Sequence, residues 1–181
     1  MVSPLQTGTV THEERQPMPE WGQQGEVSLE RIMSPNQMPH PGTLGALTVA
    51  LVQGLDGTIC EFFSGEFGLV IHREPPSCRE PDRAVFEPYT TVEPDGYFHS
   101  QPQLAIEVSA SESRTKTTEK LRDHKSIGTD EVWCLSPEAA TVEDLYLERG
   151  GLGRNTIFVE GVLRPKHLLN VPIDTPQIWP D

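Results

Sequence analysis

The chain has 181 residues, of which 35% are hydrophobic and 23% are charged, and its formal net charge is −13. This length and composition predict one compact globular domain, although 17 prolines indicate long irregular segments. No apolar run reaches the roughly 20 residues that span a bilayer, and the N-terminus lacks a basic segment followed by an apolar one, so we expect a cytoplasmic protein with no membrane partner. The excess of acidic residues opposes non-specific binding to a polyanion.

The first 41 residues contain six prolines and the polar run "THEERQPMPEWGQQGE", a composition typical of an extended arm. Within this arm, short strands are predicted only around "EVSLERI", residues 26–32. The segment 43–55, "TLGALTVALVQGL", follows with leucines at positions 44, 47, 51 and 55. This spacing places the leucines on one helical face, and Thr43 is suited to cap the N-terminus, so we predict a largely buried helix.

A β-rich stretch comes next. The segments "TICEFF" (58–63) and "EFGLVI" (66–71) meet at "SGE", a short connection that contains glycine and predicts an antiparallel hairpin. Further strands are predicted at 83–88, 104–108, 131–135 and 141–147, and a helix at 114–127 that ends at Gly128.

The helix between the strands at 104–108 and 131–135 predicts a crossover connection that makes these strands parallel neighbours. The fold class is therefore α/β, with a mixed β-sheet flanked by helices. We expect this core to span residues 42–163. The C-terminal segment 164–181 is short and interrupted by prolines, so we expect it to lie over the surface.

Two acidic residues stand at the ends of apolar strands. Glu107 interrupts the run "LAIEV", and Asp82 precedes the strand "RAVF". A buried carboxylate is costly unless it is paired, hydrogen-bonded or bound to a metal, so Glu107 needs a partner. If the two strands are neighbours, both carboxylates lie at one edge of the sheet, where they could hold a hard cation such as Mg²⁺.

The segment after Glu107 adds groups that could bind an anion. Ser109 and Glu112 have the spacing of a capping box, which would present free backbone N–H groups at the start of the next helix. Lys116, Lys120 and His124 follow at intervals of four residues and are predicted to share one helical face. A lysine beside a metal and a phosphodiester could stabilise developing negative charge. Five of the 14 basic residues fall within 114–125, which allows a basic patch on an acidic protein.

The segments "PDRAVF", "PQLAIEVSASES", "EKL" and "GTDEVWCLSPEAATVEDLYL" resemble, in this order and spacing, the Uma family within the PD-(D/E)XK superfamily of restriction-endonuclease-like proteins. The resemblance runs from Pro81 to Leu147, with a weaker match in "MSPNQMPHPGTLGALTVAL". It implies a restriction-endonuclease-like fold and a metal-dependent endonuclease that hydrolyses phosphodiester bonds of nucleic acid. The implied cofactor is Mg²⁺ or Mn²⁺, the expected substrate is DNA, and a homodimer is compatible with this family.

Carried over by position, the resemblance implies that Asp82 and Glu107 bind the metal and that Lys120, on the following helix, completes the catalytic set. The lysine that usually stands two residues after the acid is absent, because Ser109 occupies that position.

The chain also departs from the family pattern. Lys116 stands where the family tends to have aspartate, and His124 stands where it tends to have tyrosine. The helix at 43–55 contains no carboxylate, so an accessory acid would have to be Glu30 or Glu66. His40 matches a histidine of the family, without an assigned role.

Other interpretations of these residues stay open at this point. Asp82 could simply cap a turn, and Glu107 could form a structural ion pair with Lys120 or Arg114. His124 fits a helix-surface position better than that of a ligand. The chain could accordingly be a nuclease, a catalytically degenerate nuclease fold that serves as a binding or regulatory module, or a protein-interaction domain with an acidic surface.

Overall fold

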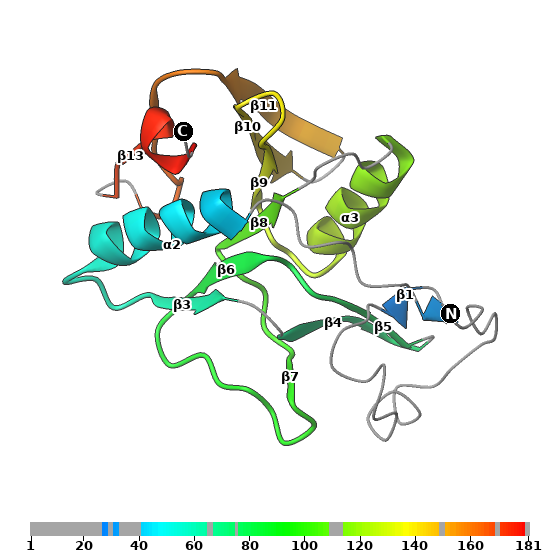
Figure 1. The fold of residues 1–181 in the computed structure, drawn as a ribbon. Helices are drawn as coiled ribbons and strands as arrows, with labels where there is room; N and C mark the ends of the chain where they lie inside the picture. Colours follow the sequence, from blue (N-terminus) through cyan, green and yellow to red (C-terminus); the bar gives the residue numbers. More distant parts are fainter. Residues whose placement is uncertain are drawn as a thin grey trace, which may run out of the picture.

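The protein is described by a computed structural model that covers residues 27–28, 31–32, 41–64, 67–74, 76–108, 114–148, 151–168 and 171–179. Its main sheet has six strands in the order β11-β10-β9-β8-β6-β3 (Figure 1). Their bounds are β3 Glu61–Ser64, β6 Arg83–Phe86, β8 Leu104–Val108, β9 Glu131–Ser136, β10 Thr141–Glu148 and β11 Gly151–Phe158.

The main sheet is mixed, as predicted. Strand β8 pairs antiparallel with β6 and parallel with β9, and helix α3 (Arg114–Ser126) makes the crossover between β8 and β9. The helix ends at Ser126, and Gly128, two residues later, has a φ of +93°, a left-handed conformation that favours glycine.

A smaller sheet contains strands β4 (Gly68–Arg73), β5 (Pro76–Arg79) and β7 (Tyr97–Phe98), in the order β5-β4-β7. The predicted hairpin of 58–63 with 66–71 is therefore wrong: β3 pairs with β6, whereas β4 pairs with β5 and β7. Phe63 on β3 and Phe67 just before β4 belong to different sheets but share one aromatic cluster with Phe86 and Phe98. This cluster packs the small sheet against the main sheet.

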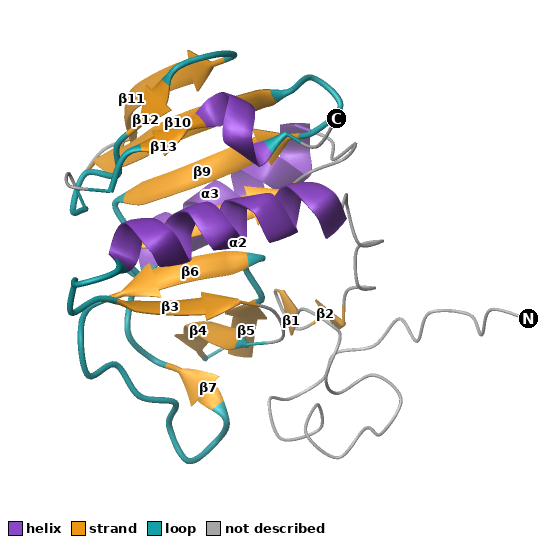
Figure 2. Ribbon diagram, turned by 60° about the vertical axis from the view of Figure 1, so that its left-hand side comes forward, coloured by secondary structure: helices purple, strands orange, loops and turns teal. Residues whose placement is uncertain are grey.

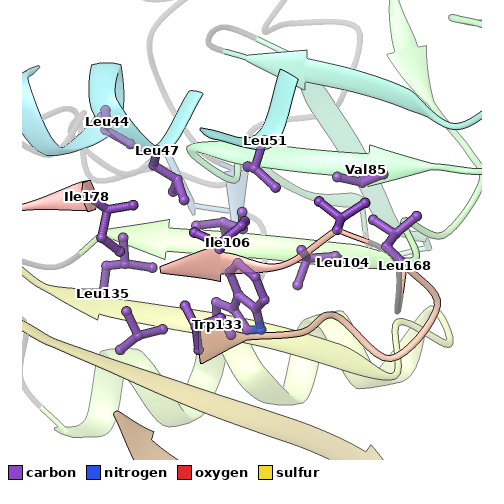
Figure 3. Close-up of a cluster of buried hydrophobic side chains, with 14 of the residues drawn as sticks. Leu44, Leu47, Leu51, Val85, Leu104, Ile106, Trp133, Leu135, Leu168 and Ile178 are labelled. Atoms are coloured by element: carbon purple, nitrogen blue, oxygen red, sulfur yellow. The ribbon is translucent and has the colours of Figure 1, made fainter. Parts of the chain in front are cut away.

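Helix α2 (Pro41–Leu55) confirms the predicted first helix and covers one face of the main sheet. Its leucines 44, 47, 51 and 55 are buried in one cluster with residues of the sheet. Figure 3 shows Leu44, Leu47 and Leu51 above Val85, Ile106 and Trp133 of three neighbouring strands. The helix also has a solvent-exposed face, on which Val49 and Val52 are more than half exposed. Burial of the leucine face stabilises the helix, since a helix of this length is marginal alone.

Helix α3 lies on the opposite side of the main sheet from α2 (Figures 1 and 2). Leu121 of α3 packs on a cluster of Ala105 and Val132, which project from β8 and β9 on the face away from α2. Side chains alternate along a strand, so Glu107 points to the α3 face while Ile106 points to the α2 face. The acid in "LAIEV" is thus directed at the helix that follows it in sequence.

The C-terminal segment differs from expectation, because it contributes to the main core. Strand β12 (Val162–Leu163) pairs with β13 (Ile173–Asp174), and a 3-10 helix, η1 (Thr175–Ile178), follows. Val171, Ile173 and Ile178 are buried in the cluster beneath α2. The prolines make the segment irregular, but its buried apolar residues pack in the same cluster as the α2 leucines.

The expected short strands of the N-terminal arm are present as β1 (Val27–Ser28) and β2 (Arg31–Ile32), which pair antiparallel. The rest of the arm lies outside the described residues. None of the described helices combines the length and the apolar character that a membrane crossing requires.

Candidate active site

Asp82 directly precedes β6, and Glu107 lies on the neighbouring strand β8. Arg83 pairs with Ile106 across β6 and β8, and this register continues to place Asp82 beside Glu107. The carboxylate of Asp82 accepts a hydrogen bond from the backbone N–H of Val108, with an Oδ2–N distance of 2.7 Å. This bond fixes Asp82 to the strand that carries Glu107.

Glu107 has two cationic or polar partners, both from α3. Lys120 Nζ donates to Oε2 at 2.8 Å, and His124 Nε2 lies 2.9 Å from Oε1. Glu107 is only 3% exposed, Lys120 7% and His124 0%. Lys120 therefore supplies the charged partner that buried Glu107 requires, and His124 supplies a hydrogen bond to its other carboxylate oxygen.

The burial of His124 corrects the expectation that it lies on the helix surface. Residues 120 and 124 are one turn apart, so both project from α3 toward the same carboxylate. Because an ionised carboxylate only accepts hydrogen bonds, Nε2 of His124 must carry the proton that it donates. The four-residue spacing from Lys120 was the available sequence signal for this role.

The two carboxyl groups have opposite electrostatic environments. Burial raises the pKa of Glu107, but the Lys120 ammonium and the hydrogen bond from His124 outweigh it and lower the pKa to about 2. Burial, reinforced by the negative charge of Glu107, raises the pKa of Asp82 to about 6, although the Val108 N–H and the charges of Lys120 and Arg83 oppose the shift. Glu107 is thus ionised at neutral pH, and its charge disfavours a second carboxylate beside it.

This arrangement fits a hard divalent cation. Its donors are carboxylate oxygens, which Mg²⁺ and Mn²⁺ prefer to soft ligands. A cation between Asp82 and Glu107 would relieve the repulsion that raises the pKa of Asp82. Within the described ranges, no group of three or more His, Cys, Asp or Glu residues has the arrangement of a metal site. Mg²⁺ commonly takes several of its ligands from water and substrate.

Several residues named from the sequence cannot be placed beside this site. Glu30, His40 and Glu66 lie outside the described residues, as does the proposed capping box of Ser109 and Glu112. Lys116 belongs to α3, but its side chain also lies outside what the structure describes.

The fold and sequence are similar to known proteins. The crystal structure of a "putative nuclease belonging to DUF820" from Anabaena variabilis superposes with a TM-score of 0.74 at 18% sequence identity, over 94% of this chain and 97% of that chain. At this identity the match shows a common fold. No curated protein has significant similarity to the chain. The family model Uma2, described as "Putative restriction endonuclease", matches residues 11–177. Because this match covers most of the sequence and agrees with the resemblance of its motifs, the chain belongs to the Uma2 family.

Proposed function

We propose that this protein is a metal-dependent endonuclease that hydrolyses phosphodiester bonds of DNA. The observation that carries the proposal is the convergence of Asp82, Glu107 and Lys120, which come from two strands and a helix, at one place in the fold. Membership of the Uma2 family and the fold shared with the Anabaena protein support it.

Asp82 and Glu107 would hold Mg²⁺ or Mn²⁺, since both supply oxygen ligands at the same edge of the sheet. When bound, the cation would act as a Lewis acid toward the phosphodiester. Lys120 would not ligate it, because an ammonium group has no lone pair. The Lys120 ammonium, which donates to Glu107, would stabilise the negative charge that grows on a phosphate oxygen in the transition state.

A second function is favoured by one specific observation. Both oxygens of Glu107 already accept hydrogen bonds from buried groups, as in a closed structural ion pair. The chain could therefore be a catalytically degenerate member of the family that uses the nuclease fold as a binding or regulatory module. Each carboxylate oxygen has two acceptor sites, however, so the present contacts leave room for a cation.

Calorimetry and cleavage separate these functions. Wild type should bind Mn²⁺ and cut plasmid DNA in Mg²⁺ or Mn²⁺, but not in EDTA, and Asp82→Asn should lose the Mn²⁺ heat and the cleavage. Low salt is the appropriate condition, because the attraction between DNA phosphates and the basic residues of the 114–125 segment is then least screened. Glu138→Gln is the matched control: it also removes one carboxylate, but at an exposed position, and should behave as wild type. Equal Mn²⁺ heats for wild type and Asp82→Asn, with no cleavage by either, would favour the binding module.

A further inference from the structure

We infer that Arg79 and Asp123 are positioning residues that set the distance between the two halves of the proposed site. This inference rests on the proposed function for its kinetic consequences, but its structural part is independent of catalysis. Arg79 ends strand β5 of the small sheet, and Asp123 is on α3. The Nε of Arg79 donates to Asp123 Oδ2 at 2.7 Å, and Nη2 lies 2.5 Å from the same oxygen.

The pair joins two segments that each carry a group of the site. Arg79 stands three residues before Asp82, and Asp123 stands directly before His124 and three residues after Lys120. Pro81, which is buried, separates Arg79 from Asp82 and restricts the backbone between them. A displacement of Arg79 would therefore be transmitted to Asp82.

The Arg79–Asp123 ion pair also fixes helix α3. Residues 120, 123 and 124 lie on adjacent positions of one side of α3, so a contact at 123 determines both the rotation and the position of the helix along its axis. The C-terminal end of α3 is also supported by Ile127, which packs on the aromatic cluster between the sheets.

Together these contacts form a closed ring around the proposed site. From Arg79 the ring runs through Asp82 to Val108 and Glu107, passes to Lys120 and His124, and returns through Asp123. The Arg79 side chain is 5% exposed and that of Asp123 is 18% exposed, so the ion pair is shielded from screening by solvent. A shielded pair with two donors on one oxygen restricts geometry more than an exposed pair does.

Arg79→Lys is the decisive variant, because it keeps the charge but replaces the planar guanidinium, with its two donors, by a single ammonium. We expect kcat for DNA cleavage to fall by about 10- to 100-fold, as a misplacement of about 1 Å can cause. KM should stay within about twofold of wild type, whereas Mn²⁺ affinity should fall together with kcat, because a displaced Asp82 coordinates the cation less well. Arg73→Lys is the matched control: Arg73 lies on the neighbouring strand β4 and contacts His99.

Exchange of the two charged residues of the ion pair gives a second test. Asp123→Asn should lower kcat as Arg79→Lys does, and the double variant Arg79→Asp with Asp123→Arg should recover part of the loss. A loss of folded protein would also lower the apparent kcat at unchanged KM, so kcat is calculated per folded molecule, with the folded fraction measured by circular dichroism.

A spectroscopic measurement keeps the inference separate from the proposed function. The proton on His124 Nε2, hydrogen-bonded to Glu107, should give a downfield NMR signal that is absent in His124→Gln. Arg79→Lys should shift or broaden this signal, whereas Arg73→Lys should not. If wild type cuts no nucleic acid but the signal responds in this way, the proposed function fails and the positioning role stands. If Arg79→Lys leaves both the signal and any cleavage unchanged, the positioning role is wrong.

Discussion

Asp82 and Val108 are joined by a hydrogen bond from the backbone N–H of Val108 to the Asp82 carboxylate, at 2.7 Å. The bond crosses from the start of β6 to the residue that follows Glu107 on β8. Asp82 is thereby oriented by the strand that carries the other acid, rather than by its own loop. An asparagine at position 82 can keep this bond through its carbonyl oxygen, which makes Asp82→Asn a test of charge and not of folding.

Lys120 is expected to act on the substrate and not on the metal. Lys120→Gln keeps a donor for Glu107 but removes the positive charge, so Mn²⁺ binding should persist while the rate of DNA cleavage falls by about 10² to 10³, the effect of one electrostatic group. Glu107→Gln should lose both properties. Isothermal titration with Mn²⁺ and single-turnover cleavage measure the two effects. Loss of Mn²⁺ binding in Lys120→Gln would contradict this division of roles.

His124 is expected to stabilise the fold through Glu107. In His124→Phe the Glu107 carboxylate loses a buried donor, so the free energy of unfolding should fall by about 1–3 kcal/mol. His124→Tyr offers a hydroxyl donor to Glu107, so it should be less destabilised than the phenylalanine variant. Urea denaturation at pH 7 measures both. A phenylalanine variant as stable as wild type would show that this hydrogen bond contributes nothing.

The sequence predicted elements whose apolar pattern is strong and missed those whose pattern is weak. Helix α2 carries four leucines at helical spacing, and β8 is a continuous apolar run apart from one acid, so both were predicted with nearly correct bounds. Strand β5 was missed because consecutive prolines at 75 and 76 suggested a turn. A proline is allowed as the first residue of a strand, which is the position of Pro76.

The sequence also named part of the candidate site. Asp82, Glu107 and Lys120 were named from their positions beside apolar strands and from the family resemblance, and the structure brings them together. The burial of His124 was missed, because α3 has few apolar residues and hence no apolar stripe to show which face packs on the sheet; only the four-residue spacing from Lys120 indicated it. The contact of Arg79 with Asp123 joins residues 44 positions apart, and no local pattern encodes such a pair.

Glu131 should make stability depend on pH between its ordinary pKa of 4.5 and its raised pKa of about 8. This residue is fully buried, with Oε1 accepting from Trp133 Nε1 at 3.0 Å and Oε2 from the Lys166 N–H at 2.7 Å. Burial, reinforced by the negative charge of Asp144, raises its pKa to about 8, although the two hydrogen bonds oppose the shift. The folded state keeps a proton that the unfolded chain releases near its usual pKa of 4.5, so the free energy of unfolding should decrease from pH 4.5 to about 8.

Urea denaturation between pH 6.5 and 8.5 tests this dependence. Wild type should lose stability as the pH rises, with a slope of at most about 1.4 kcal/mol per pH unit from this group. Glu131→Gln cannot ionise but lacks one acceptor, so it should be less stable than wild type at pH 6.5, and the difference should narrow toward pH 8.5. Glu138→Gln, which removes an exposed carboxylate, should follow the wild-type profile. Parallel profiles for wild type and Glu131→Gln would show that Glu131 does not titrate in this range.

Gly54 tests whether the C-terminal segment belongs to the core. A Cβ atom added to Gly54, in the last turns of α2, would lie 2.3 Å from Cγ1 and 3.4 Å from Cβ of Val171. Val171 is fully buried, so it cannot move aside into solvent. Gly54→Ala should therefore destabilise the protein by about 1–3 kcal/mol, the usual effect of overpacking. Gly45, in the same helix, has no atom within 4 Å of an added Cβ.

Gly45→Ala is the matched control, and the opposite sign is expected: an exposed helical glycine replaced by alanine should stabilise by about 0.5–1 kcal/mol. Val171→Ala should partly compensate Gly54→Ala, because it removes the Cγ1 atom in conflict and leaves only a Cβ at an ordinary distance. Urea denaturation of the two single glycine variants, of Val171→Ala and of the double variant gives the coupling free energy. If Gly54→Ala stabilises as Gly45→Ala does, and the double variant is merely additive, then residue 171 does not pack on α2 and the C-terminal segment lies over the surface, as its prolines first suggested.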